Sequence, residues 1–279
     1  MGDLALAYLA AVTDSNEVLD DRSAPAAQRI ADLAKMGAAP GKFVLIEDEE
    51  PLLNAIRAGV KFEAVYVLDS VDVPEAVAQA CREHGFALTI MSAQLATSLF
   101  KSDKRPDIFG IARMPRPVRA ERFHGQERDL LILDGVRIVG NIGAIVRSAL
   151  AFGAGGIILV DSGLKSIADR RLIRASRGYV FSLPVAIMTW EQVSQLIDAT
   201  SLPTVVLDAH GEADLAQLNE RPEPLAFVLG AETVGPSKQA TQTAALTVSI
   251  PMSSAVESLN VSVTAGVLLH ARSARNLAL

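Results

Sequence analysis

The sequence predicts an α/β protein of two domains, and three observations support this prediction. Helical and strand-like segments alternate along the 279 residues. Several strand-like segments of the second half are apolar at consecutive positions, as are parallel strands covered on both faces. Residues 113–128 have two prolines, five arginines and no apolar periodicity, which is typical of a linker. We therefore expect an N-terminal extension at 1–23, a domain at 24–112, the linker at 113–128 and a second domain at 129–279.

The first domain is expected to be a small α/β sandwich of alternating helices and strands. Pro51 and Pro74 suit the first turn of a helix, and Gly37 and Gly85 suit a helix end. The helices are expected at 26–37, 51–59, 74–85 and 93–100, and the strands at 42–48, 63–69, 87–91 and 109–114.

The second domain is expected to contain strands separated by helical stretches. Asn141 is the predicted N-cap of a helix whose apolar stripe leaves Arg147 facing away from the core. Ser258 is the predicted N-cap of a last helix that runs to about Arg275, on which His270 is expected to be packed or at an interface. The strands are expected at 130–136, 156–161, 183–188, 204–209, 225–230 and 246–251.

Composition and charge limit the classes of function. Half of the residues are hydrophobic, which allows a well-buried core, and the net charge of −6 argues against a general nucleic-acid binder. An RNA-binding role would therefore depend on local basic patches, and the linker at 113–128 is either a solvated connector or such a patch. The single cysteine, Cys81, excludes an intrachain disulfide and is expected to be a small buried side chain.

The sequence also gives expectations about location and partners. The N-terminal GDLALAYLAAVT has no preceding basic region and no convincing cleavage pattern, so it is not expected to be a signal peptide. No run reaches the roughly 18 apolar residues that a membrane span needs. The histidines are scattered and no zinc-binding motif occurs in the sequence, so no metal site is expected. We therefore expect a cytoplasmic protein with no membrane partner.

Three segments carry the candidate chemistry. In the first, a strand leads to a helix that bears Asn141 and Arg147. In the second, a buried strand runs into a turn with Gly230 and Glu232, and ligands bind at the carboxyl ends of parallel strands. In the third, a strand stops at Pro251 and a loop of small polar residues leads to the last helix. The pattern favours a ligand site formed by strand ends.

In their order and position, these segments resemble motifs 1, 2 and 3 of the SpoU branch of the SPOUT RNA methyltransferases. The matching residues are Asn141–Arg147, Gly230–Glu232 and Ile250–Asn260. IEDEEPLLNAIRAGV, FKSDKRPDIFGIARMPRP and SIADRRLIRASRGYVFSLPV further resemble the thiostrepton- and nosiheptide-resistance methyltransferases, from about residue 25 onward. The resemblance implies an L30e-like RNA-binding N-terminal domain, a SPOUT domain with a deep trefoil knot, and a homodimer with each cofactor pocket near the dimer interface.

The resemblance also implies a reaction, which is S-adenosylmethionine-dependent methylation of a ribose 2'-hydroxyl of 23S ribosomal RNA in the loop where thiopeptide antibiotics bind. The implied catalytic residues are Arg147, Asn141, Glu232, Ser258 and Asn260. The implied cofactor contacts are Leu207, Gly230, Ile250, Met252 and Leu259, with Arg177 as a further phosphate or cofactor contact. RNA capture is assigned to an aromatic ring among basic side chains, Phe100, Lys101, Lys104 and Arg105, although Phe100 has the alternative of a place in the core.

Other functions stay open at this point. Motif 2 has Thr233 where the resistance enzymes carry a lysine. The resistance enzymes also carry a basic cluster just before the IED segment, where this chain has only Lys35 and Lys42 on either side of small residues. The target nucleotide and the resistance activity are therefore not fixed. The alternatives are 2'-O-methylation of another rRNA or a tRNA site, and an RNA-binding relative without catalysis. An oxidoreductase is disfavoured, because the glycines at 153–156 follow a helix and precede a strand, the reverse of a dinucleotide-binding motif.

Overall fold

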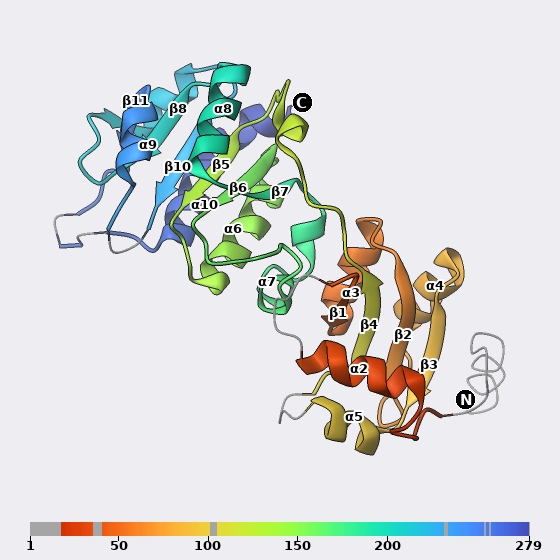
Figure 1. Cartoon of the computed structure of the whole chain (residues 1–279). Helices are drawn as coiled ribbons and strands as arrows, with labels where there is room; N and C mark the ends of the chain where they lie inside the picture. The colour runs from red at the N-terminus through yellow and green to blue at the C-terminus, as the bar shows by residue number, and fades with distance from the viewer. Residues whose placement is uncertain are drawn as a thin grey trace. The chain divides into compact units, whose positions relative to one another are not determined.

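The computed structural model divides the chain into two compact units, whose elements are drawn in Figure 1. Unit 1 comprises 1–115 together with 168–178, and unit 2 comprises 116–167 together with 179–279. This division differs from the expected boundaries at two places, because most of the expected linker joins unit 2 and 168–178 joins unit 1. The residues that the structure describes are 18–35, 41–100, 105–231, 234–253, 255–256 and 258–278.

Unit 1 is a four-stranded sheet with helices on both faces (Figure 1). The strands lie in the order β1 (Phe43–Glu47), β4 (Ile108–Arg113), β2 (Phe62–Leu68) and β3 (Ala87–Met91), and β4 is antiparallel to both neighbours. The main core lies on the face where Ile30 and Leu99 pack against Leu68 and Phe109. The helices and strands expected at 24–112 are confirmed. The helices are α2 (Pro25–Lys35), α3 (Glu49–Arg57), α4 (Glu75–His84) and α5 (Ala93–Phe100). Unit 1 also includes α7 (Arg170–Ala175), which comes from later in the sequence.

Residues 168–178, here called the α7 excursion, are held in unit 1 by charge. Glu47 at the end of β1 is only 8% exposed and forms ion pairs with both Arg170 and Arg174, the latter at 2.8 Å from Nη2 to Oε2. Asn54 donates a hydrogen bond from Nδ2 to the carbonyl oxygen of Arg177 at 2.9 Å. A buried carboxylate must be paired with an opposite charge or satisfied by hydrogen bonds, so these contacts explain why the excursion belongs to unit 1.

Unit 2 is built on a seven-stranded sheet in which every pair of neighbouring strands is parallel. The order is β7 (Val185–Met188), β6 (Gly156–Val160), β5 (Leu130–Asp134), β10 (Ala226–Gly230), β8 (Thr204–Leu207), β11 (Leu246–Ser249) and β9 (Ala213–Asp214). The six expected strands are confirmed, whereas β9 is too short for the sequence to predict.

Helices cover both faces of this sheet (Figure 1). One face carries α8 (Trp190–Thr200), α9 (Lys238–Thr243) and the 3₁₀ helix η1 (Ala120–Phe123), which all contribute to one hydrophobic core. The other face carries α6 (Val139–Ala151) and α10 (Val261–Leu277), which contact each other. Two further 3₁₀ helices are η2 (Tyr179–Phe181) and η3 (Leu215–Glu220).

Both predicted helix caps of unit 2 are wrong. Helix α6 begins two residues before Asn141, with Ile138 as its N-cap, so Asn141 lies inside the first turn. Helix α10 is capped by Asn260 rather than Ser258, because the Asn260 Oδ1 accepts a hydrogen bond from the Ser262 N–H at 2.8 Å. Asparagine and serine cap helices about equally well, so residue type alone does not distinguish the two positions.

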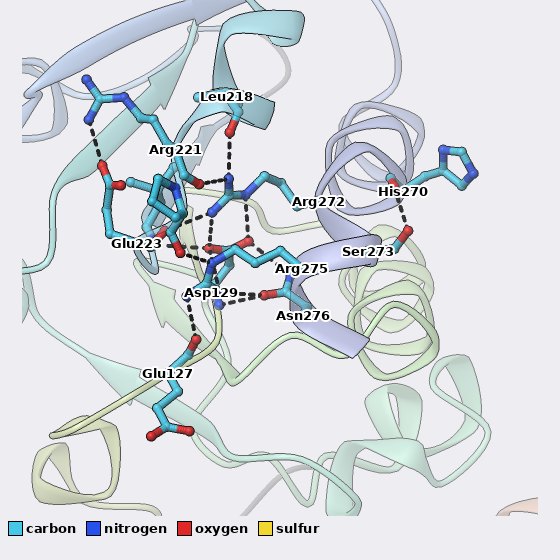
Figure 2. A network of polar contacts seen from close by, with 12 residues as sticks. Glu127, Asp129, Leu218, Arg221, Glu223, His270, Arg272, Ser273, Arg275 and Asn276 are labelled. Carbon is cyan, nitrogen blue, oxygen red and sulfur yellow. Dashed lines mark hydrogen bonds and ion pairs between the residues drawn. The ribbon is translucent and has the colours of Figure 1, made fainter. Parts of the chain in front are cut away.

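At the amino end of the unit 2 sheet, a buried polar cluster fixes α10 (Figure 2). Asp129 comes directly before β5 and is 0% exposed, and Arg272 of α10 is 2% exposed. The Arg272 guanidinium binds the Asp129 carboxylate through Nε and Nη2, each at 3.0 Å. Its remaining N–H groups donate to the carbonyl oxygens of Leu218, Arg221 and Glu223. All five guanidinium donors therefore have an acceptor, as a buried charge requires.

Asn276 completes this amino-end cluster, the name used below for Asp129, Arg272 and Asn276. Its Nδ2 donates to the Asp129 carboxylate at 3.0 Å, and its Oδ1 accepts from the Asp129 backbone N–H at 3.1 Å. The Leu225 N–H donates to the same carboxylate at 3.0 Å. The last turns of α10 are thus joined to the start of β5 and to the residue that precedes β10.

The expectations for Cys81, for membrane-spanning helices and for the trefoil knot have different outcomes. Cys81 is confirmed as a buried side chain at 1% exposed, and burial raises the pKa of its thiol to about 11. Among the described helices, none has the length and apolar character needed to cross a membrane. The trefoil knot stays a prediction, because strand order does not define how the chain threads.

Candidate active site

The carboxyl ends of β8, β10 and β11 meet at one edge of the unit 2 sheet. These strands are neighbours in the order β10-β8-β11 and run parallel, so their last residues lie side by side. A cavity of about 390 Å³ opens there. It is lined mainly by strand ends and by the start of α10, namely Leu207, Asp208, Ala209, His210, Leu229, Gly230, Ala231, Gly235, Pro236, Val248, Ile250, Met252, Ser258, Leu259, Val261 and Thr264.

The turn after β10 shapes one wall of this cavity. A β-carbon at Gly230 would overlap the backbone of Gly235 and Pro236, so the chain can fold back this closely only at glycine. Gly235 has a φ of +69°, and its N–H donates to the Ala231 carbonyl oxygen at 2.8 Å. The glycines of the second segment therefore bring two stretches of backbone together beside the cavity.

A buried carboxylate holds this turn in place. Asp134 at the end of β5 is 5% exposed. It accepts hydrogen bonds from the Trp190 Nε1 at 2.8 Å and from the Ser237 backbone N–H at 2.7 Å. Ser237 is also the N-cap of α9. The turn after β10 is thereby tied to the neighbouring strand and to the helix that follows.

The first and third motifs meet through two asparagines. The Asn260 Nδ2 lies 3.3 Å from the Asn141 Oδ1, to which it donates a hydrogen bond. Since Asn141 lies in the first turn of α6 and Asn260 caps α10, the contact joins the beginnings of two helices. Residues that are 119 positions apart in the sequence are thus brought together, as the candidate chemistry requires.

Arg147 is exposed on α6, as the sequence predicts. Among the residues that the structure describes, its guanidinium has no hydrogen-bond or ion-pair partner, and it does not contribute to the lining of the cavity. A guanidinium in this state is available to an anionic ligand that comes from outside the chain.

The remaining predicted site residues lie in several places. Arg177 belongs to unit 1, where it has a φ of +53° and forms an ion pair with Glu50 at 3.4 Å. Phe100 is half-buried and packs edge-on against Phe109 with ring centroids 5.0 Å apart. The Arg105 side chain bonds to Thr97 and Asp107 at 3.0 and 3.2 Å. Glu232, Lys101 and Lys104 lie outside the described residues.

Sequence reasoning missed two polar residues of the cavity, Asp208 and His210. The His210 backbone N–H donates to the Asp208 carboxylate at 2.8 Å, and the Asp208 backbone N–H donates to the Val248 carbonyl oxygen at 3.0 Å. Both residues follow β8 directly, so the rule that ligands bind at strand ends could have found them. Within the part of the chain that is described, no group of histidine, cysteine and acidic side chains could hold a metal ion.

Comparison with known proteins identifies the family. The profile of the SpoU rRNA Methylase family matches residues 129–270, and that of the Thiostrepton-resistance methylase, N terminus, matches residues 16–126. The chain is 49% identical over 261 residues to the "23S rRNA (adenosine(1067)-2'-O)-methyltransferase" of Streptomyces laurentii, which covers 94% of this chain and 97% of the relative.

Solved structures have the same fold. A crystal structure of an RNA 2'-O ribose methyltransferase, 28% identical, matches with a TM-score of 0.77 over 94% of this chain and 100% of that one. The AdoMet-bound rRNA methyltransferase from Sinorhizobium meliloti, 24% identical, matches with a TM-score of 0.75 over 94% and 98%. The fold, the converging strand ends and the two sequence matches agree. The chain therefore belongs to the SpoU rRNA methylase family and is an rRNA-methylating enzyme.

Proposed function

We propose that this enzyme transfers the methyl group of S-adenosylmethionine to a ribose 2'-hydroxyl of 23S ribosomal RNA. The observation that carries the proposal is the cavity at the ends of β8, β10 and β11, since about 390 Å³ lies in the range of small-molecule sites. The activity named for the Streptomyces laurentii relative and the AdoMet bound to the Sinorhizobium meliloti protein support it.

The residues present fit an adenosyl ligand. Gly230 lacks a side chain where backbone segments approach each other, and the lining is mostly apolar, which suits an adenine ring. We assign the adenosine and methionine contacts to Leu207, Gly230, Ile250, Met252 and Leu259. When bound, the cofactor supplies an activated sulfonium methyl group, so the chain mainly orients the reactants.

The ribose oxygen is assigned to Arg147. A guanidinium hardly loses its proton in proteins, so Arg147 does not act as a base. It holds the adjacent phosphate and stabilises the negative charge that develops on the 2'-oxygen. Asn141 and Asn260, through their mutual hydrogen bond, and Ser258 fix the geometry beside it. By family resemblance, Glu232 is assigned to the same catalytic site. Arg177 is assigned, on the same basis, as a contact to a phosphate or to the cofactor.

The target is proposed to be the nucleotide that the relative's name specifies, adenosine 1067, and the modification to confer resistance to thiostrepton-type antibiotics. The match of residues 16–126 to the thiostrepton-resistance N terminus supports this assignment. RNA capture is assigned to unit 1, through Phe100, Lys101, Lys104 and Arg105. Because ribosomal RNA is cytoplasmic and the single cysteine suits a reducing compartment, the enzyme is proposed to act in the cytoplasm.

The active enzyme is proposed to be a homodimer that joins through α10 and the start of α6. Val263 and Val267 lie one turn apart on α10 and are 49% and 38% exposed, and Ile138 before α6 is 55% exposed. Apolar side chains in such an arrangement favour burial against a second copy. A dimer would also explain why the cavity of one chain lacks its own Arg147, since the partner can supply it.

The test combines two measurements on the full chain. S-adenosylmethionine binding is measured by calorimetry for the parent and for Gly230→Ala, which should lose affinity by more than about tenfold because the added methyl displaces backbone. Ser70→Ala, an exposed position of unit 1 that lies outside both the cavity and the proposed dimer face, serves as the control. Labelled methyl is then transferred to 23S RNA fragments and to tRNA, and the modified ribose is mapped.

The outcomes separate the alternatives. Methylation of the fragment that contains adenosine 1067 supports the proposal. Methylation at another rRNA site or in tRNA contradicts the assigned target. If the chain binds RNA but neither binds the cofactor nor transfers methyl, it is a non-catalytic relative.

A further inference from the structure

Residues 116–128 carry four exposed arginines against two exposed acidic residues, Glu121 and Glu127, in an acidic protein. Arg116, Arg119, Arg122 and Arg128 are all exposed, whereas the whole chain has a net charge of −6. Within the described part of the chain, none of these four guanidinium groups has a hydrogen-bond acceptor or an ion-pair partner. By contrast, Arg221 forms an ion pair with Glu223 at 3.1 Å. The charges of this segment, called the arginine strap below, are therefore available to a partner.

The arginine strap has a fixed conformation rather than that of a free linker. Phe123 is 0% exposed and belongs to the hydrophobic core of unit 2, and Val118 packs against the same core. The Gln126 side chain donates to the Arg122 carbonyl oxygen at 3.1 Å. An anchored backbone presents its charged side chains with a smaller loss of conformational entropy on binding than a disordered one.

The geometry of η1 places two of the arginines along one edge. Arg119 is the N-cap of η1 and Arg122 lies three residues later. A 3₁₀ helix has three residues per turn, so positions i and i+3 align. The side chain of Phe123 occupies a different edge, which faces the core. Arg119 and Arg122 thus occupy neighbouring, exposed positions on the same edge of η1.

We propose that the arginine strap is a second RNA-binding surface of the enzyme, which contacts the sugar-phosphate backbone of the ribosomal RNA substrate. Guanidinium groups bind phosphate oxygens in a bidentate manner, and paired arginines match successive phosphates. Because Phe123 is buried, it cannot stack on a base, so the contact reads backbone rather than sequence. The inference rests on the proposed function, since it concerns the same RNA.

The test compares three double variants of the full chain with the parent, using a 23S RNA fragment. Arg119→Ala/Arg122→Ala should weaken RNA binding on the order of tenfold at moderate salt and lower the slope of log Kd against log salt by about 1.4, because two phosphate contacts are lost. The KM for RNA should rise while kcat at saturating RNA stays at the parent value. Arg119→Lys/Arg122→Lys should retain most of the affinity, since the charge is kept.

The third variant, Arg82→Ala/Arg221→Ala, removes the same net charge from two arginines that are already paired, with Glu75 and Glu223. It should leave affinity and slope unchanged. Equal losses in this control and in the alanine strap variant would overturn the proposal, because the effect would then be one of net charge. Unchanged binding by the alanine strap variant, in a parent that methylates the fragment, would also overturn it. A parent that neither binds nor methylates the fragment removes the proposed function as well.

Discussion

The two ends of α10 use their polar groups in opposite ways. At the C-terminal end, the amino-end cluster is buried, and each guanidinium N–H of Arg272 has an acceptor within the chain (Figure 2). At the N-terminal end, Ser258 and Asn260 are exposed and stand beside a cavity of about 390 Å³. One helix therefore joins a region closed to ligands to a region open to them.

The difference shows how the fold separates stability from activity. Buried charges stabilise a fold only when every donor and acceptor is paired. A site that must bind a cofactor and RNA instead needs groups that can still accept or donate to a ligand. The amino-end cluster is of the first kind, whereas Ser258 and Asn260 beside the cavity are of the second kind, so substitutions in these two places should have different consequences.

The largest effect is expected at the closed end, from Arg272→Met. This change removes the two hydrogen bonds from the Arg272 guanidinium to the buried Asp129 carboxylate and leaves only the more distant Arg275, with its Nη1 3.8 Å from the Asp129 Oδ1, as a counter-charge. Breaking a buried ion pair in this way costs about 3–5 kcal/mol of unfolding free energy. Urea unfolding of the variant and the parent measures the difference. Arg221→Ala, which breaks a half-buried ion pair with Glu223, is the control and should cost about 1 kcal/mol or less. A similar small loss for both variants would mean that the amino-end cluster does not stabilise the fold.

The next effect is expected at the open end, from Arg147→Ala. Because Arg147 is exposed and unpaired among the described residues, the variant should unfold at the same urea concentration as the parent. It should bind S-adenosylmethionine normally but transfer methyl about 10²–10³-fold more slowly, since it lacks the group that stabilises the 2'-oxygen. Single-turnover methylation measures the rate. A rate near that of the parent would remove Arg147 from its assigned role.

Asn260 tests whether capping and site geometry can be separated. Asn260→Ala removes the cap of α10 and should cost about 0.5–2 kcal/mol. Asn260→Asp keeps an oxygen that can accept from the Ser262 N–H but loses the Nδ2 donor to Asn141. The aspartate variant should therefore be nearly as stable as the parent but slower in methyl transfer. Parent-like activity of the aspartate variant would show that the contact between the two asparagines has no catalytic role.

The smallest effect on stability is expected in unit 1, from the buried thiol of Cys81. Burial raises the pKa of this thiol from its ordinary value of 9.0 to about 11, so the neutral form is favoured in the folded state. Stability should be unaffected below pH 9 and should fall as the pH rises from 9 toward 11, because the unfolded thiol then loses its proton first. The folded protein should resist iodoacetamide at pH 8, and rapid alkylation there would contradict the burial.

Much of the fold could be predicted from the sequence because its signals are local. The apolar runs that became β5, β6 and β10 are buried at nearly every position, and Gly85 ends α4 with a φ of +68°. The predictions of the N-caps of α6 and α10 were wrong for a reason that is also local. Polar residues of similar propensity compete within a few positions, and the backbone around Asn141 and Ser258 decides between them.

The parts that could not be predicted depend on contacts between distant residues. The sequence gives no sign that Asp129 will be buried against Arg272, 143 positions away. Nothing local indicates that Phe123 anchors a segment rich in arginine and proline, so the segment reads as a linker. In the site, family resemblance supplied the residues of the cavity wall that follow β10 and β11, whereas Asp208 and His210 emerged only when the strand ends were assembled.

The α7 excursion has a consequence for how the protein can be divided. Unit 1 is not a continuous stretch of sequence, because it needs 168–178 from between two strands of the other unit's sheet. A gene fragment that stops at residue 115 would encode Glu47 without Arg170 and Arg174, and would thereby remove both cationic partners of its carboxylate. Exchange of unit 1 between relatives must therefore transplant two separate stretches of sequence at once.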